Sequence, residues 1–122
     1  MTTRGIRGAT TVIADQPELI LAATQEMLDA ILRANPSLQT ADIASAFFTT
    51  TEDLVSAYPA LAARQLGWEH VPMMCAREIP VPGSLAHCVR VLVEWNTDLA
   101  QIAIKHVYLR EAFSLRPDLL VS

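Results

Sequence analysis

The segment at residues 87–96 reads HCVRVLVEWN and decides the fold class. Polar and apolar side chains alternate along it with the two-residue period of a β-strand. One face carries Val89, Val91, Val93 and Trp95, and the other carries Cys88, Arg90, Leu92 and Glu94. The segment therefore predicts a strand that has one apolar face and an arginine on the opposite face.

Four further segments have the composition of strands, at residues 6–12, 42–50, 71–76 and 105–109. Glycines interrupt the N-terminal strand region at Gly5 and Gly8, and glycine in a strand often marks a close approach by another backbone or a ligand. Together with the strand at 87–96, these segments predict a sheet of about five mostly antiparallel or mixed strands.

Two helices are expected between the strands. Asp15 with Glu18 three residues on resembles a helix start. Apolar residues then recur at helical spacing, which predicts a helix of about 17 residues ending at Asn35. A short helix at 60–66 fits between Pro59 and Gly67. The pattern predicts a single α+β domain over residues 1–122.

Composition bounds the function. The net charge is −4, so there is no global basic field to recruit nucleic acid. Eight of the nine basic residues are arginine, which favours planar, bidentate capture of carboxylates, and the ninth is Lys105. The two cysteines form no C-x-x-C, and no apolar run approaches about 18 residues. We expect a soluble, cytoplasmic protein with no membrane partner.

Charged and reactive side chains stand inside or beside the predicted strands. Arg7 and Arg90 lie within β-rich runs, where a charge must face water, form a pair or line a polar cavity. Glu78 follows the third strand, and loops at strand ends often carry functional groups. The pattern alone also fits solvated charges, a buried apolar Cys75 and a half-buried Tyr108.

Cofactor chemistry finds no support in the sequence. The three histidines are scattered, at His70, His87 and His106, and no His or Cys spacing matches a zinc site. There is no glycine-rich nucleotide loop and no nucleophile elbow. We therefore expect neither a metal nor an organic cofactor.

Five segments carry a resemblance to a known family. They read RGIRGATT at 4–11, VPMMCARE at 71–78, CVRV at 88–91, HVYL at 106–109 and LRPDL at 115–119. In this order and at these intervals they resemble the small, trimeric, monofunctional chorismate mutases of the Bacillus type. Each segment is a weak signal, but five in order are highly specific, and they cover essentially the whole chain.

The resemblance implies an isomerase that converts chorismate to prephenate without a cofactor, in phenylalanine and tyrosine biosynthesis. It also implies a homotrimer that forms a pseudo α/β barrel, with active sites at the subunit interfaces. By resemblance, the catalytic residues are Arg90 at the ether oxygen of the breaking bond, Glu78 at the ring fragment and Arg7 at a carboxylate.

The resemblance further implies a set of substrate-binding residues. These are Tyr108, Cys75, Met73, Met74, Leu115 and Arg116, with Tyr58, Ala60 and Arg64 in or near the neighbouring subunit's contribution. Two positions depart from the family pattern. Tyr58 stands where phenylalanine is expected, and Leu61 stands where the best-known relatives carry lysine, which puts one charge at the site entrance in doubt.

Two other functions remain open on the sequence. A non-catalytic trimeric binding module would bind its small molecule tightly without turnover. The reactive-imine deaminases also form barrel-shaped trimers with pockets at the subunit interfaces. Their own arginine-containing signature near the C-terminus is not found in this sequence. We favour the mutase, because its charge set suits the reaction and not only the ligand.

Overall fold

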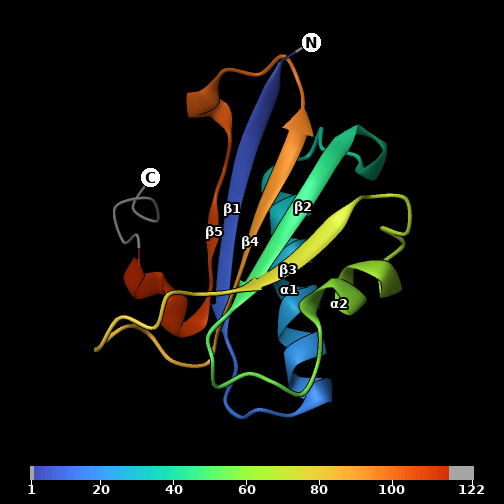
Figure 1. Ribbon diagram of the computed structural model, residues 1–122. Helices are drawn as coiled ribbons and strands as arrows, with labels where there is room; N and C mark the ends of the chain where they lie inside the picture. Colours follow the sequence, from blue (N-terminus) through green and yellow to red (C-terminus); the bar gives the residue numbers. More distant parts are fainter. Residues whose placement is uncertain (1, 116–122) are drawn as a thin grey trace.

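Within residues 2–115, which the computed structural model describes, five strands form one mixed sheet in the order β3-β2-β4-β1-β5 (Figure 1). The strands are β1 (Thr3–Thr11), β2 (Ile43–Thr50), β3 (Met73–Arg77), β4 (Cys88–Asn96) and β5 (Val107–Tyr108). The helices are α1 (Pro17–Ala34) and α2 (Pro59–Gln65), with 3-10 turns η1 (Thr40–Asp42), η2 (Gln101–Ala103) and η3 (Arg110–Leu115).

The strand at 87–96 is the centre of this sheet. As β4 it pairs antiparallel with both β1 and β2. The outer strands are parallel to their neighbours, β3 to β2 and β5 to β1. The predicted α+β class with a mixed sheet is therefore confirmed.

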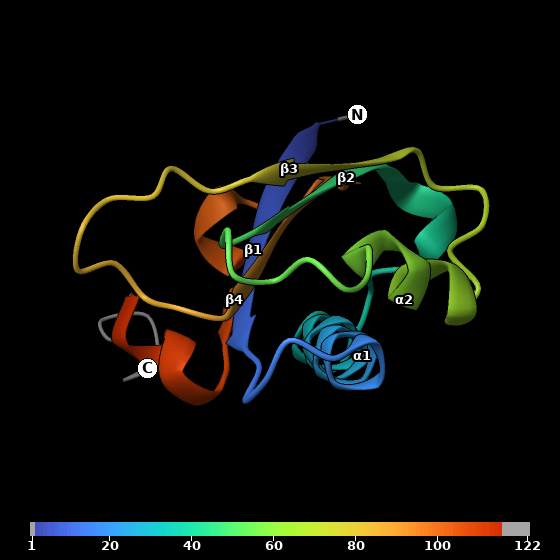
Figure 2. The ribbon, with the colours of Figure 1, turned by 60° about the horizontal axis from the view of Figure 1, so that its bottom comes forward.

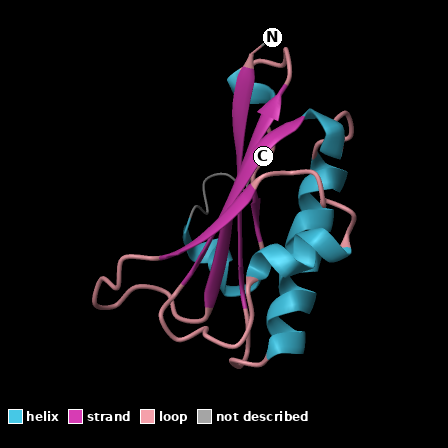
Figure 3. Cartoon of the chain, turned by 45° about the vertical axis from the view of Figure 1, so that its right-hand side comes forward, coloured by secondary structure: helices cyan, strands magenta, loops and turns pink. Residues whose placement is uncertain are grey.

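Both helices cover the same face of the sheet (Figures 2 and 3). The apolar face of β4 lies under them, with Val89, Val91, Val93 and Trp95 all buried. Ile20, Met27 and Ile31 of α1 are fully buried in the same core. Because each such side chain contributes about 1.5–3 kcal/mol of transfer free energy, this helix–sheet contact dominates the stability of the domain.

Gly8 lies where α1 packs tightly on the sheet, and its close neighbours are side chains and not the backbone or ligand that the strand glycine predicts. A Cβ at this position would lie 2.8 Å from Cδ1 of Ile31 and 3.1 Å from Cγ1 of Val91. Only glycine lets helix and strand pack at this distance. Gly67, with a φ of 93°, follows α2 in the left-handed conformation expected after a helix end.

Two local predictions need correction. α1 begins at Pro17 after Gln16, and no side chain caps it. Asp15 does not cap the helix because its carboxylate accepts hydrogen bonds from the loop at 55–56 instead. The last strand is also shorter than predicted, since β5 comprises only Val107–Tyr108 and the chain then turns into η3.

Within the described part of the chain, no helix has the length and apolar character needed to cross a membrane.

Candidate active site

The strand register brings four side chains into one row across the sheet face that the helices leave open. Thr49 of β2 lies opposite Arg90 of β4, and Arg90 lies opposite Ala9 of β1. Ala9 in turn lies opposite Tyr108 of β5. Ala9 and Tyr108 are buried together in a small apolar cluster at the β5 end of this row.

A cavity of about 430 Å³ opens over this row. It is lined by Arg7, Gly8, Ala9, Phe47, Thr49, Arg90, Val91, Leu92, Tyr108 and Leu115. Four residues that the sequence predicts for the site therefore meet here, namely Arg7, Arg90, Tyr108 and Leu115. They come from three strands and from η3, so the folded sheet is needed to assemble them.

Glu78 joins this group from the end of β3. Its backbone N–H donates to the carbonyl oxygen of Thr50 at 2.9 Å. Its Oε2 accepts a hydrogen bond from the Thr49 hydroxyl and lies 3.7 Å from Nε of Arg90. The side chains of Arg90 and Glu78 are 44% and 24% exposed, so solvent screens this loose ion pair and it adds little to stability.

Cys88 lies on the same face of β4 as Arg90, and its thiol carries no negative charge that could pair with the Arg90 guanidinium. Burial raises the pKa of the Cys88 thiol, and the nearby Arg90 guanidinium only partly opposes this shift. The thiol is therefore neutral at physiological pH. The neutral thiol therefore forms no ion pair with the Arg90 guanidinium.

Arg7 supplies the second cation of the cavity. It lies opposite Leu92 on the register and is exposed on the open face. Its backbone N–H donates to Nδ1 of His106 at 2.9 Å, which ties β1 to the segment entering β5. Two guanidinium groups with a carboxylate beside one of them suit a ligand that carries negative charge and a hydrogen-bond donor.

The remaining predicted residues lie around a second cavity of about 290 Å³. It is lined by Tyr58, Ala60, Arg64, Met73, Met74 and Cys75. Within one chain these residues do not line the first cavity, so the structure places the predicted set in two groups. Cys75 is exposed and not buried, because it lies on the edge strand β3 where the helical layer ends.

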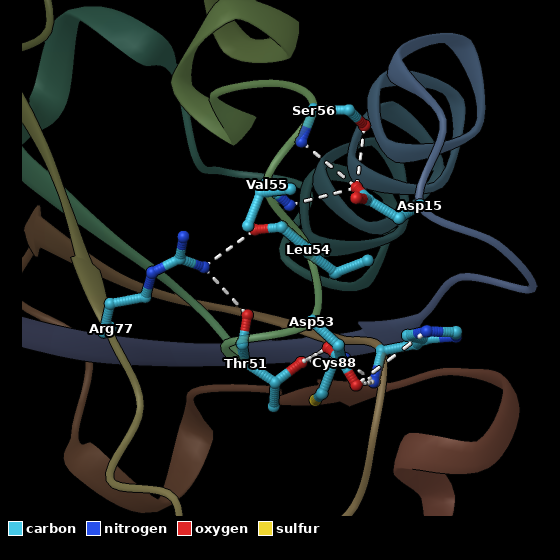
Figure 4. A network of polar contacts seen from close by, with 9 residues as sticks. Asp15, Thr51, Asp53, Leu54, Val55, Ser56, Arg77 and Cys88 are labelled. Carbon is cyan, nitrogen blue, oxygen red and sulfur yellow. Dashed lines mark hydrogen bonds and ion pairs between the residues drawn. The ribbon is translucent and has the colours of Figure 1, made fainter.

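The loop before Tyr58 is held by hydrogen bonds from β3 (Figure 4). Arg77 donates from one terminal nitrogen to the carbonyl oxygens of Thr51 at 2.9 Å and Leu54 at 2.7 Å. Because Arg77 directly precedes Glu78 in the chain, this contact fixes the loop relative to the end of β3. The positions of both groups of site residues are therefore linked through Arg77.

Asp15 holds the same loop from the opposite side (Figure 4). Its Oδ1 accepts from the Ser56 hydroxyl at 2.7 Å and from the backbone N–H groups of Ser56 and Val55. The Ser56 hydroxyl is the main cause of the lowered pKa of Asp15.

Asp53, in the same loop, also has a lowered pKa. Desolvation by burial would raise the pKa of this carboxyl, but hydrogen bonds from the Thr51 hydroxyl and the His87 N–H lower it by more.

Six lining residues of the first cavity were not predicted from the sequence, and three of them, Phe47, Thr49 and Leu92, carry large or polar side chains on the open face. Leu92 could have been found, because it shares the predicted face of Arg90. The other two required the register between β2 and β4, which the sequence does not reveal. Arg116 lies outside the described residues.

The fold and the cavity define a small α+β domain with a cavity on its open sheet face that two arginines line. The family model for chorismate mutase type I matches residues 3–119. Chorismate mutase AroH of Thermus thermophilus is 57% identical over 116 residues, which is 95% of each chain. The Bacillus subtilis protein of the same name is 43% identical over 120 residues, covering 98% of this chain and 94% of that protein.

Solved structures agree with the sequence comparisons. The chorismate mutase from Clostridium thermocellum matches with a TM-score of 0.88 and 47% identity, over 90% of this chain and 97% of that one. The chain therefore belongs to the type I chorismate mutases. This confirms the resemblance drawn from five short segments, and it disfavours both the binding module and the deaminase.

Proposed function

We propose that the chain converts chorismate to prephenate in the cavity over β1, β4 and β5. The observation that carries this proposal is the convergence of Arg7, Arg90 and Tyr108 on one cavity, with Glu78 beside Arg90. The reaction is an intramolecular Claisen rearrangement, in which a C–O bond breaks while a C–C bond forms. It needs no proton transfer and no nucleophile.

Catalysis then rests on holding the reactive conformer and on electrostatics. Chorismate carries two carboxylates, and Arg7 with Tyr108 binds one of them. Arg90 donates to the ether oxygen and to an adjacent carboxylate. As the C–O bond lengthens, negative charge grows on the ether oxygen, and Arg90 stabilises it.

Glu78 acts on the other fragment. The ring becomes cation-like as the bond breaks, and the Glu78 carboxylate stabilises that charge. The same carboxylate accepts a hydrogen bond from the ring hydroxyl of chorismate. Because Glu78 Oε2 lies 3.7 Å from Arg90 Nε, the two charged groups can act on neighbouring parts of one substrate molecule.

We also propose that the active protein is a homotrimer with a pseudo α/β barrel, in which the second group of residues completes a neighbour's site. Tyr58, Ala60, Arg64, Met73 and Met74 would then reach the first cavity of the next subunit. Cys75 would contact the substrate hydroxyl or help place Glu78. Exposed apolar side chains support this assembly, with Tyr58 72% and Met74 66% exposed.

The two free thiols, Cys75 and Cys88, support the cytoplasm as the place of action, since reducing compartments keep cysteines unpaired.

The substitution Glu78→Ala tests the proposed function. It removes the carboxylate beside Arg90, so we expect a large fall in kcat with an unchanged circular dichroism spectrum. Glu78→Asp keeps the charge but displaces it, and its kcat should be intermediate. Glu69→Ala removes an exposed carboxylate outside both cavities and serves as the matched control. Wild-type kcat for Glu78→Ala would show that the carboxylate has no part in catalysis.

A further inference from the structure

We propose that Thr49 is a positioning residue for Glu78, and that its hydroxyl keeps the carboxylate from closing onto Arg90. This inference rests on the proposed function, because it assigns Thr49 a role in that reaction. Neither the strand pattern nor the family resemblance pointed to this residue.

The register gives Thr49 a central place in the site. On β2 it lies opposite Arg90 of β4 on one side and opposite Ala76 of β3 on the other. Its side chain is partly buried and lines the first cavity. It is therefore the polar side chain between the strand that carries Arg90 and the strand that leads to Glu78.

The hydrogen bond fixes the direction of the Glu78 carboxylate. An ionised carboxylate can only accept, so the Thr49 hydroxyl must donate its proton to Oε2. The next residue, Thr50, holds the backbone of Glu78 through its carbonyl oxygen at 2.9 Å. Adjacent residues of β2 thus hold both the main chain and the side chain of Glu78.

The same oxygen faces Arg90. The closest approach between the two side chains joins Oε2 of Glu78 to Nε of Arg90, at 3.7 Å. This is longer than a hydrogen bond, so the guanidinium donors of Arg90 are not engaged by the carboxylate. Arginine and carboxylate groups that are free to move favour a closer, two-bond pairing.

Thr49 opposes that closure. A β-branched side chain in a strand has a restricted χ1 angle, so the hydroxyl holds Oε2 from a fixed position. Without it, the Glu78 side chain can move onto the Arg90 guanidinium and occupy the donors that the ether oxygen needs. The expected defect lies in kcat, because the interaction with the ether oxygen strengthens only in the transition state.

Thr49→Val is the principal test, because valine keeps the shape of threonine and lacks the hydroxyl. We expect kcat for chorismate to fall by roughly 10–100-fold, the usual effect of one hydrogen bond to a charged group, with little change in KM. Thr49→Ser restores the hydroxyl and should recover most of kcat. Thr49→Ala is a second hydroxyl-free variant if valine disturbs the strand, and circular dichroism checks the fold of each.

The Glu78→Ala background separates this role from a structural one. If Thr49 acts through Glu78, the change to valine should cost nothing further once the carboxylate is gone. Equal losses in both backgrounds, or no loss for Thr49→Val in the wild-type background, would overturn the role of Thr49 while leaving the proposed function intact. Wild-type activity of Glu78→Ala would overturn the role of Glu78 and with it that of Thr49, whereas failure of the wild-type chain to turn over chorismate would overturn the proposed function.

Discussion

Arg90→Ala should nearly abolish turnover while leaving the protein folded. The structure lets us estimate the effect of this substitution on stability and on kcat separately. The ion pair of Arg90 with Glu78 is 3.7 Å long and partly exposed, so its loss costs about 1 kcal/mol of stability at most. That is a shift of no more than about 4 °C in Tm. Losing a donor aimed at the ether oxygen should cost about 3–4 kcal/mol in the transition state, or roughly 10²–10³ in kcat.

Steady-state kinetics with chorismate measures the change in kcat, and thermal unfolding of the same preparations measures the change in Tm. Arg90→Lys is the informative partner, because it keeps a positive charge and loses the planar fork. Little recovery of kcat is expected from it. If Arg90→Lys retains most of kcat, a simple charge is enough and the proposed geometry is wrong. If Arg90→Ala also retains it, Arg90 is a solvated strand residue.

Three further predictions concern packing, acid stability and assembly. Gly8→Ala should lower the free energy of unfolding by about 1–3 kcal/mol through overpacking against Ile31, whereas Gly5→Ala, whose nearest neighbour is a side-chain methyl of Leu92, should cost less. Because the pKa of Asp15 is lowered by folding, its ionised carboxylate stabilises the protein above its unfolded pKa, and this stabilisation is lost as pH falls through the folded pKa. In urea titrations, the difference in free energy of unfolding between wild type and Asp15→Ala should therefore become smaller as the pH is lowered. The protein should scatter light as a trimer, and where Arg90 and Arg64 are both essential and Arg64 reaches the next subunit's site, a mixture of Arg90→Ala and Arg64→Ala chains should be more active than either variant alone. A fully active monomer would contradict this assembly.

The sequence predicted the elements of this fold well where the hydrophobic period was unambiguous. The alternation in 87–96 identified the central strand and its buried face, and helical spacing placed α1 to within a residue or two. Asp15 was wrongly predicted to cap the helix, because its carboxylate accepts hydrogen bonds from a loop 40 residues away in the chain. Local sequence patterns cannot predict such long-range contacts.

The site was predicted by resemblance and only in part by pattern. Arg7 and Arg90 were conspicuous as charges in strands, but a solvated sheet face fitted the pattern equally well. Their meeting with Tyr108 depends on a register in which Ala9 stands between Arg90 and the ring. Thr49 could not have been found, since its importance comes from the pairing of β2 with both neighbours.

The most direct test mixes the purified protein with chorismate and follows the loss of its ultraviolet absorbance, with an uncatalysed control. We expect rapid loss of chorismate and stoichiometric formation of prephenate, unchanged by EDTA and by exhaustive dialysis. Tight binding of chorismate with no turnover would contradict the proposed mutase activity. Loss of activity on dialysis that a metal or nucleotide restores would contradict the cofactor-free mechanism.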